Sequence, residues 1–451
     1  MNDELKVGSR VKIEKNGTVY EGVVIPSSIF SEKNMVNIKL DNGYNTGIKI
    51  DEKCNIIYLS EPEPDKTAER DASHNGNIEN IHERGNDNGS ITIISTGGTI
   101  ASYVDYVTGA VKPVVDGSGF MSIIPELNDM GKISIKPVLN ILSENISFED
   151  WTLLARECYN NIKKDTGVVV LHGTDTMGYT TSLLSFMIQN PSAPLIFVGS
   201  QRSIDRPSSD GFFNIISAVN LIKAEVMSEV AVMMHASTSD DGVSIHRGVK
   251  VRKMHSSRRD AFRTINGMPL GFIGPSLTDE KFRDFMGEYN FTPKYGIEYN
   301  RIQFNKQNIW LRKDVKKGGN TEFFPKINRK VSLVWFYPDM KRDDFEFLKG
   351  KEGVVFAGSG LGHMNKDMIE LVKELVKKGI VTAISTQCIN GTVNMNVYET
   401  GRELIKAGAI SASIMTPEVA FTKLSWALAN SSAIDDTVKL FKQNIAGELS
   451  Y

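Results

Sequence analysis

The chain has 451 residues, and its 52 lysine and arginine residues nearly balance its 54 aspartate and glutamate residues, giving a formal net charge of -2 at pH 7. Because single hydrophobic cores stop growing near ~250 to 300 residues, we expect at least two domains and favour three. The balanced charge excludes strong nucleic-acid binding by overall electrostatic attraction, so any RNA contact has to be local or supplied by a partner.

The cysteines and the apolar runs indicate the compartment. The three cysteines, Cys54, Cys158 and Cys388, are odd in number and far apart, which argues against a disulfide framework and a zinc cluster. The first residues, MNDELKVGSR, lack the apolar stretch of a secretion signal, and no later apolar run approaches the ~18 to 20 residues that cross a bilayer. We therefore predict a cytoplasmic protein without a metal site and without membrane contact.

Residues 1–60 are predicted to form a small β-barrel of SH3 size. Short alternating apolar stretches there are separated by turn signals, among them Asn16-Gly17. An Asn-Gly pair between such stretches is a strong hairpin signal, since a type I′ turn needs two residues that tolerate positive φ. Residues 61–90 follow as a flexible linker, because they are charged, rich in Asn and Gly, and almost without large apolar side chains.

Strand-like and helix-like stretches alternate through the rest of the chain. Apolar runs such as ITIIS and GVVVL alternate with amphipathic stretches such as FEDWTLLARECYNNIKK. This pattern is typical of βαβ units in a mostly parallel sheet with helices on both faces. We predict an α/β fold with a large doubly wound domain over 91–285, a polar connecting segment over 286–330 and a small α/β domain over 331–451.

Three segments carry residues suited to catalysis, and the first is STGGTIAS at 95–102. It follows the strand-like run ITIIS, and ligands of open α/β sheets bind beyond the carboxyl ends of the strands. Adjacent glycines let the backbone approach a ligand closely, while the threonines offer hydroxyls. An ordinary glycine-rich turn explains the spacing equally well. The segment is neither a dinucleotide-binding fingerprint nor a phosphate-binding loop.

The other two segments pair a hydroxyl or an amine with charged neighbours. LHGTDTM at 171–177 places Thr174 beside Asp175 at the end of a strand-like run, although either residue could simply cap the following helix. VRKMHSSRRDAF at 251–262 is a charge cluster of the kind that usually lies in a solvated loop. A partly desolvated lysine held near a carboxylate can, however, act as a base toward a hydroxyl, which makes Lys253 the residue of interest.

TGGTIAS, LHGTDTM and RKMHSSRRDAF occur in the order and approximate spacing of the bacterial-type L-asparaginase family, which the chain resembles over about residues 90–440. The resemblance implies an amidohydrolase whose nucleophile is Thr99. It also implies that Asp175 orients Lys253 and that Lys253 acts through Thr174 on the nucleophile or on water. Nearby backbone N–H groups would stabilise the oxyanion. Which threonine attacks first is left open.

The same resemblance implies a set of substrate-binding residues. Tyr106 matches a mobile-loop tyrosine that assists the nucleophile, with Tyr103 as a rival for that role. Ser143 and Glu144 match residues that hold the α-carboxylate and α-ammonium groups of the substrate. The expected substrate-binding residues are Tyr106, Ser143, Glu144, Gly98 and Gly173.

The small domain departs from the asparaginase pattern. Family asparaginases complete their site with small-domain residues of a neighbouring subunit, but the corresponding stretches diverge here, so Asp339, Gln387 and Glu399 receive no assigned role. The stretch NMNVYETGREL, and the combination of barrel, linker and asparaginase-like body, instead resemble the D subunit of the archaeal glutamyl-tRNA(Gln) amidotransferases. This second resemblance covers essentially the whole chain.

The second resemblance implies a glutaminase subunit that passes ammonia to a partner E subunit. The partner would use ATP and magnesium to convert misacylated Glu-tRNA(Gln) into Gln-tRNA(Gln), and it would make most of the tRNA contacts. This chain would bind no cofactor itself, and its sequence contains no nucleotide-phosphate loop. We expect a heterotetramer assembled through a homodimer of this chain.

Two other functions stay open. A free-standing cytoplasmic L-asparaginase with an accessory barrel fits the same motifs. One methylene separates asparagine from glutamine, and a pocket discriminates that difference by only ~1 to 3 kcal/mol. A non-catalytic scaffold whose barrel docks RNA or protein is the third function, and the joint presence of Thr99, Thr174, Asp175 and Lys253 argues against it.

Overall fold

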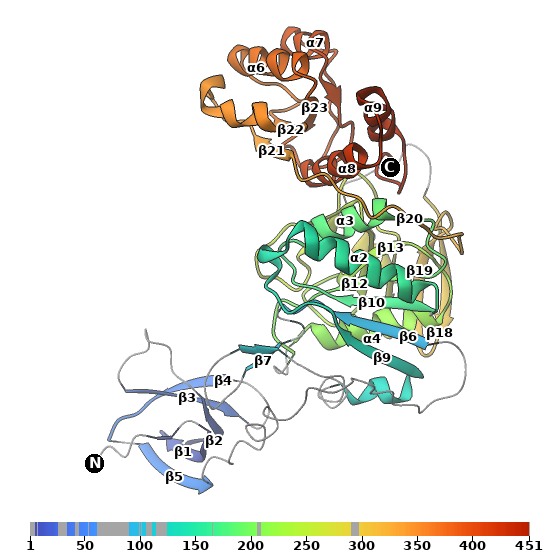
Figure 1. Ribbon diagram of the computed structural model, residues 1–451. Helices are drawn as coiled ribbons and strands as arrows, with labels where there is room; N and C mark the ends of the chain where they lie inside the picture. Colours follow the sequence, from blue (N-terminus) through green and yellow to red (C-terminus); the bar gives the residue numbers. More distant parts are fainter. Residues whose placement is uncertain are drawn as a thin grey trace, which may run out of the picture.

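The computed structural model of the protein places a five-stranded sheet at the N-terminal end, a nine-stranded sheet in the middle of the chain and a four-stranded sheet near the C-terminal end (Figure 1). No helix among the residues described combines the length and the apolar composition needed to cross a membrane. The structure describes residues 5–6, 8–25, 34–40, 45–52, 54–60, 90–98, 100, 102–104, 111–113, 124–164, 166–204, 209–289 and 297–450.

The N-terminal sheet is antiparallel, with strand order β4-β3-β2-β1-β5. Its first hairpin turns at Asn16 and Gly17, whose φ angles of 50° and 79° are those that the Asn-Gly signal predicts. The five strands are β1 (Arg10–Lys15), β2 (Thr18–Ile25), β3 (Met35–Leu40), β4 (Asn45–Lys49) and β5 (Cys54–Ser60). The buried side chains that they share are Val11, Ile13, Val24, Ile38 and Ile48.

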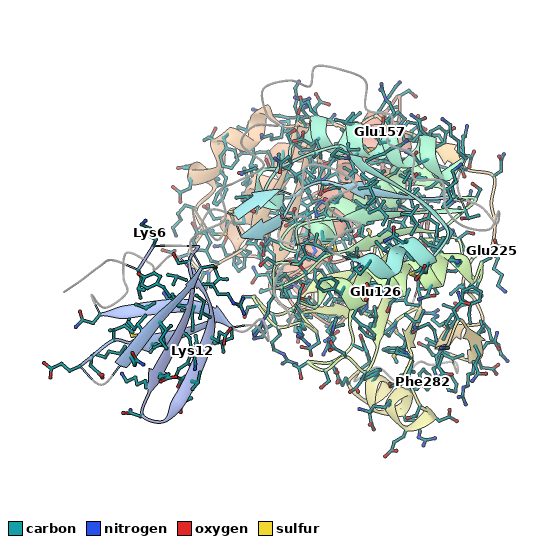
Figure 2. The ribbon with its side chains drawn as sticks, turned by 90° about the horizontal axis from the view of Figure 1, so that it is seen from below. Lys6, Lys12, Glu126, Glu157, Glu225 and Phe282 are labelled. Carbon is teal, nitrogen blue, oxygen red and sulfur yellow. The ribbon has the colours of Figure 1, made fainter. Side chains whose placement is uncertain are left out.

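Basic side chains of the N-terminal sheet are paired with carboxylates, which dilutes any positive patch on it. Figure 2 shows the sheet at one side of the molecule, with Lys6 and Lys12 labelled. The pairs, with their nitrogen to oxygen distances, are Arg10 with Glu21 at 3.3 Å, Lys12 with Glu14 at 2.9 Å and Lys15 with Asp51 at 2.9 Å.

The nine-stranded sheet is mixed, with order β18-β19-β17-β14-β13-β12-β10-β6-β9. Five neighbouring strands are parallel, and these are β13 (Val230–His235), β12 (Leu195–Val198), β10 (Gly167–Leu171), β6 (Ser90–Ser95) and β9 (Lys132–Pro137). The remaining four are antiparallel, and these are β14 (Val243–Arg247), β17 (Gly271–Gly274), β19 (Gln307–Arg312) and β18 (Tyr299–Phe304).

Helices cover both faces of this sheet because alternate strand residues are apolar on both sides. In β10, Val168 and Val170 belong to the buried cluster under α2 and α3, whereas Val169 and Leu171 belong to the cluster under α4. The helices are α2 (Phe148–Ile162), α3 (Met177–Met187), α4 (Gly211–Lys223) and α5 (Asp279–Gly287). Short elements complete the domain: β7 (Ser102–Val104), β8 (Val111–Pro113), η2 (Pro125–Asp129), η3 (Ser143–Asn145), β11 (Ile188–Gln189), β15 (Val251–Lys253), β16 (Phe262–Thr264) and β20 (Glu322–Phe323).

The structure differs from the sequence analysis in the segment over 286–330, which was expected only to connect two domains. It contributes β18 and β19, an antiparallel hairpin on the edge of the nine-stranded sheet. The hairpin turns at Asn305 and Lys306, whose φ angles are 46° and 61°. An Asn-Lys pair lacks the glycine that marks such turns, so the hairpin left no clear signal in the sequence.

The small domain has a four-stranded parallel sheet with the strands in chain order. Its strands are β21 (Val331–Trp335), β22 (Gly353–Gly358), β23 (Val381–Thr386) and β24 (Ile410–Ser411). Its helices are η4 (Arg342–Gly350), α6 (Lys366–Lys377), α7 (Glu399–Lys406), α8 (Pro417–Ala429) and α9 (Ile434–Lys442). The two α/β domains confirm the predicted fold class.

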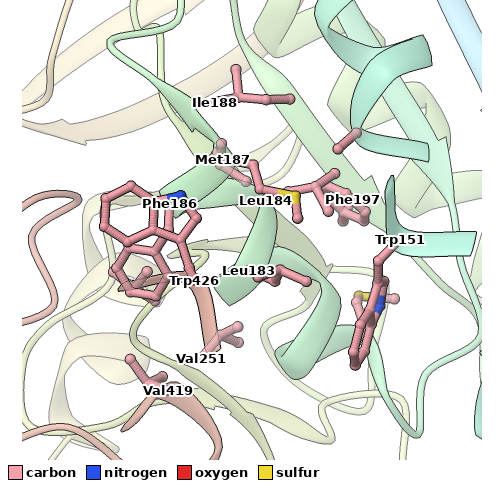
Figure 3. Close-up of a cluster of buried hydrophobic side chains, with 14 of the residues drawn as sticks. Trp151, Leu183, Leu184, Phe186, Met187, Ile188, Phe197, Val251, Val419 and Trp426 are labelled. Carbon is pink, nitrogen blue, oxygen red and sulfur yellow. The ribbon is translucent and has the colours of Figure 1, made fainter. Parts of the chain in front are cut away.

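Helix α8 joins the two α/β domains by packing on α3. Ser182 Oγ of α3 and Thr422 Oγ1 of α8 share a buried hydrogen bond of 2.7 Å. Apolar side chains of both helices enter one continuous buried cluster, in which Figure 3 labels Phe186 beside Trp426. The small domain therefore packs on α3, the helix that begins at the end of the predicted catalytic segment 171–177.

Candidate active site

Two of the predicted motifs lie side by side because the strands that precede them are neighbours. β6 and β10 pair in parallel, so the segments that follow them leave the same edge of the sheet. Thr96 secures this arrangement, since both its backbone N–H and its hydroxyl donate to the carbonyl of Leu171, at 3.1 and 2.9 Å.

Glycines at these strand ends allow three backbone segments to meet. A Cβ on Gly98 would lie 2.9 Å from Cα of Gly173, and the φ of Gly98 is +76°. A Cβ on Gly173 would lie 2.6 Å from Cβ of Ser143. Ser143 is held in turn by Thr176, whose hydroxyl donates to the Ser143 carbonyl at 2.8 Å. Only glycine fits at the first two positions, and the structure brings Gly98, Gly173 and Ser143 together.

We expect Gly173→Ala to disable the site, because the added methyl group would overlap Ser143 and push the strand-end segments apart. Displacements of about 1 Å at a catalytic site cost up to about 100-fold in rate. Ammonia release by the purified variant should fall by about that factor. Gly287→Ala, where a Cβ would meet nothing within 4 Å, is the matched control and should keep full activity. Retention of most activity by Gly173→Ala would contradict this account of the glycines.

Lys253 joins the strand-end residues from a separate hairpin formed by β15 and β16. Its Nζ donates to Thr174 Oγ1 at 2.8 Å and to Asp175 Oδ1 at 2.9 Å. The Lys253 side chain is 14% exposed and that of Asp175 is 68% exposed, while Thr174 is buried. The hydrogen bond between Nζ and Oγ1 can also form with the hydroxyl as donor to an unprotonated amine, and Thr174 Oγ1 can then accept the proton of a further hydroxyl or water. The three residues thus form a path along which a proton can move.

Helix capping does not account for Thr174 and Asp175. Helix α3 begins at Met177, its N-cap residue is Thr176, and no side chain caps it there. The alternative that the sequence left open for these two residues is therefore not what the structure shows. Their side chains contact Lys253 instead, across a long separation in the sequence.

The structure describes only some of the remaining predicted residues. Thr99 and Tyr106 lie outside the described residues. Tyr103 falls in the short strand β7, which pairs with β8. Glu144 is exposed in η3, directly after Ser143, whose exposed fraction is only 5%.

The three small-domain residues without an assigned role lie apart from the Lys253 hydrogen bonds. Gln387 donates through Nε2 to the carbonyl of Ala357 at 2.9 Å. Asp339 has a φ of 63° and accepts from Lys341 at 2.6 Å. Glu399 begins α7. Neither of the two contacts described here reaches Thr174 or Asp175, so the three residues remain without an assigned role.

His172 was missed in the sequence, although it belongs to the motif LHGTDTM. Its Nδ1 lies 2.7 Å from the carbonyl of Gly173, and its Nε2 lies 3.0 Å from the hydroxyl of Thr180, which accepts from Trp151 Nε1 at 2.8 Å. The indole therefore directs the Thr180 proton to Nε2, so the neutral imidazole carries its proton on Nδ1 and donates to Gly173. Burial lowers the pKa of His172 to about 4. A histidine at the end of a fully apolar strand is the signal that could have identified it.

Acid should destabilise the protein partly through His172. The folded-state pKa of about 4 lies below the ordinary value of 6.5, so between these values only the unfolded chain binds the proton. Stability due to the neutral ring is present above pH 6.5 and is lost as the pH falls toward 4. We expect the free energy of unfolding to fall between pH 7 and 4.5 by about 2 kcal/mol less in His172→Gln than in the wild type. Urea unfolding at both pH values measures this, and equal losses would contradict it.

Comparison with models of known protein families shows which families the chain matches. Residues 90–281 match the family described as Asparaginase, N-terminal, and residues 330–441 match the Glutaminase/Asparaginase C-terminal domain. Residues 5–59 match the GatD N-terminal domain.

Solved structures with a similar fold include L-asparaginases. The thermostable L-asparaginase from Thermococcus kodakarensis matches with a TM-score of 0.67 at 27% identity, over 80% of this chain and 99% of that chain. A probable cytoplasmic L-asparaginase from Campylobacter jejuni matches with a TM-score of 0.60 at 27% identity, over 79% of this chain and 100% of that chain. The fold and the strand-end site define an asparaginase-like enzyme subunit of the amidase type.

Relatives of similar length narrow this class. The D subunit of a glutamyl-tRNA(Gln) amidotransferase from Pyrococcus furiosus is 39% identical over 98% of this chain and 93% of its own length. The D subunit of the same enzyme from Saccharolobus islandicus is 38% identical over 100% of this chain and 94% of its own length. The chain belongs to the family of glutamyl-tRNA(Gln) amidotransferase D subunits.

Proposed function

We propose that this chain is the glutaminase subunit of a tRNA-dependent amidotransferase and that it releases ammonia from the side-chain amide of glutamine. The observation that supports this most is the contact of Lys253 with both Thr174 and Asp175 at the carboxyl edge of the large sheet. A carboxylate that holds an amine against a hydroxyl is an arrangement that can take the proton from a hydroxyl nucleophile. Membership of the D-subunit family supports glutamine as the substrate.

In the proposed reaction the Thr99 hydroxyl oxygen attacks the amide carbon of glutamine. The hydroxyl proton passes through Thr174 to Lys253, which Asp175 keeps in place, and backbone N–H groups near Gly98 and Gly173 stabilise the oxyanion. The proton then returns to the leaving nitrogen, the carbon–nitrogen bond breaks, and ammonia departs. Water hydrolyses the remaining ester to give glutamate and restore the hydroxyl. Tyr106, Ser143 and Glu144 complete the substrate site in this proposal.

The order of attack can be tested with two variants. If Thr99 attacks first, Thr99→Ala should form no covalent adduct with glutamine. Thr174→Ala should then form the adduct slowly, because only the proton path is lost. The reverse pattern, measured by intact mass after rapid quenching, would assign the first attack to Thr174.

The ammonia would be used by a partner E subunit, which binds ATP and magnesium and makes most of the contacts with Glu-tRNA(Gln). This chain would contribute no cofactor. We further propose a cytoplasmic heterotetramer in which two copies of this chain form the central dimer. The paired charges on the N-terminal sheet support a docking role for it rather than strong tRNA binding of its own.

Ammonia release from glutamine and from asparagine tests the proposal. The purified chain should turn glutamine over slowly by itself and much faster with an E subunit, ATP and Glu-tRNA(Gln). The similarity in fold to L-asparaginases favours a free-standing asparaginase as the second candidate. Fast asparagine hydrolysis by the chain alone, unchanged by these additions, would establish that function and overturn the first.

A further inference from the structure

An ion pair between the two α/β domains lies directly beside Lys253. Arg252, the preceding residue of β15, contacts Glu418 of α8 with an Nη2 to Oε1 distance of 3.3 Å. Its guanidinium also lies 5.8 Å from the ring centroid of Trp335 in the small domain. The side chains of Arg252 and Glu418 are 24% and 15% exposed, so solvent screens the pair only in part.

Side chains in the first turns of α8 pack with both segments that carry the predicted catalytic residues Thr174, Asp175 and Lys253. On the β15 side, Val419 and Val251 belong to the same buried cluster, and Figure 3 labels both. On the α3 side, the Phe421 and Tyr179 rings meet edge to face with centroids 6.3 Å apart. Tyr179 lies in the first turn of α3, just after Asp175. Burial raises its pKa to about 12, and the charge of Glu418 adds to that rise.

Stability alone gives little reason for a carboxylate at position 418. Its Oε2 is buried and has no hydrogen-bond partner among the residues that the structure describes. A buried ion pair with incomplete hydrogen bonding is often no more stabilising than apolar side chains of the same size. A charge at this place does, however, fix the position of Arg252, and Lys253 is the next residue along the same short strand.

We propose that Glu418 is a positioning residue which, through Arg252, holds Lys253 within hydrogen-bonding distance of Thr174 and Asp175. The small domain thereby sets the geometry of a proton path that lies wholly in the large domain. This inference rests on the proposed function only in needing an amide-hydrolysing site that uses Lys253. It applies equally if the amide is asparagine.

Glu418→Gln tests the proposal, because it keeps the size of the side chain and removes the charge. Since small misplacements at a catalytic site are costly, kcat should fall by about 10-fold or more while KM stays within about 2-fold. The KM is spared because the predicted substrate contacts at Ser143 and Glu144 are on another segment. Arg252→Gln, which removes the same ion pair from its other side, should lower kcat comparably and serves as the test if Glu418→Gln does not fold. Arg252→Lys, which keeps a cation beside Glu418, should lose less.

Glu229→Gln is the matched control. Glu229 forms a pair with Arg247 of similar burial, with Nε to Oε2 at 2.7 Å. The hydrogen bonds described for the two side chains do not reach Thr174, Asp175 or Lys253. Because Glu229 accepts three hydrogen bonds, the control should lose at least as much thermal stability as Glu418→Gln and keep its kcat. If kcat falls in both variants in proportion to the loss of melting temperature, Glu418 has only a structural role and the proposal is wrong.

A double variant separates positioning from a general weakening of the fold. If Glu418 acts through Lys253, then Glu418→Gln should cost less than about 2-fold in kcat in a Lys253→Arg background. The same 10-fold loss in both backgrounds would overturn the proposal. All variants are assayed with glutamine and with asparagine beside the wild type. Wild-type turnover of asparagine alone would overturn the proposed substrate, while the kcat ratios on asparagine would still decide the role of Glu418.

Discussion

Replacing Lys253 with methionine should lower kcat for amide hydrolysis by about 100- to 10,000-fold, the range that a positioned acid–base group contributes. The variant loses the amine that donates to Thr174 Oγ1 and Asp175 Oδ1. The hydroxyl of Thr174 then has no group to which it can pass a proton. Steady-state ammonia release, with the substrate above KM, measures the effect.

Lys281→Met is the control for this prediction. Lys281 also pairs with an aspartate, with its Nζ 2.7 Å from Asp241 Oδ2, and the contacts described for this pair do not include Thr174, Asp175 or Lys253. Its kcat should match that of the wild type. If Lys253→Met kept more than a tenth of the wild-type kcat, the proton path through Thr174 would be wrong.

The second large effect concerns stability, and it arises from an ion pair that is fully buried at the junction of the two α/β domains. Lys423 of α8 and Glu448 are both 0% exposed and are in direct contact. Glu448 also accepts from the backbone N–H of Ala446 at 2.8 Å. We expect Glu448→Gln to lower the free energy of unfolding by about 3 to 5 kcal/mol, because an ammonium group is left buried without its counter-charge. Urea unfolding at pH 7 measures the loss.

The pH dependence of that loss follows from Lys423. Burial lowers the pKa of Lys423 in the folded protein below the ordinary value of 10.5. Between the folded-state pKa and 10.5, the unfolded chain therefore binds the proton more strongly than the folded chain. The deficit of Glu448→Gln should therefore shrink as the pH rises toward 10.5. Adding Lys423→Met should restore most of the stability at pH 7, since neither charge is then buried.

An exposed pair provides the contrast. Lys373 and Glu370 are about half exposed, with Nζ 2.6 Å from Oε1, and Glu370→Gln should lower the free energy of unfolding far less than Glu448→Gln, because solvent screens an exposed pair. A similar cost for Glu370→Gln and Glu448→Gln would contradict the importance given to burial.

Local patterns in the sequence were sufficient to predict the α/β fold class and the N-terminal hairpin. Apolar runs such as GVVVL and the pair Asn16-Gly17 act within a few residues, so their structural consequence can be seen without knowing the fold. The hairpin at Asn305-Lys306 was missed because its turn residues carry a weaker signal. The SH3-like character of the N-terminal sheet stays a prediction.

The candidate site was predictable where a motif ends a strand. Thr174 and Asp175 could be located from the run that precedes them, but their partner Lys253 lies on a distant hairpin, and only the family resemblance linked them. His172 and Glu418 could not be found in this way. Their importance depends on what a folded chain places around them: a threonine and a tryptophan for the imidazole, and an arginine from another domain for the carboxylate.

The buried pair of Lys423 and Glu448 also bears on the order in which the chain is built. During synthesis the large domain can fold first, because domains generally fold as units from the N-terminal side. Lys423 is translated before Glu448. Until Glu448 has been made, packing α8 against Phe186 would bury the Lys423 ammonium group without its counter-charge. We therefore expect the two α/β domains to close onto each other only after Glu448 has been made and can reach Lys423. Because that closure brings Glu418 to Arg252, ammonia release by the nascent chain should rise once Glu448 can reach Lys423.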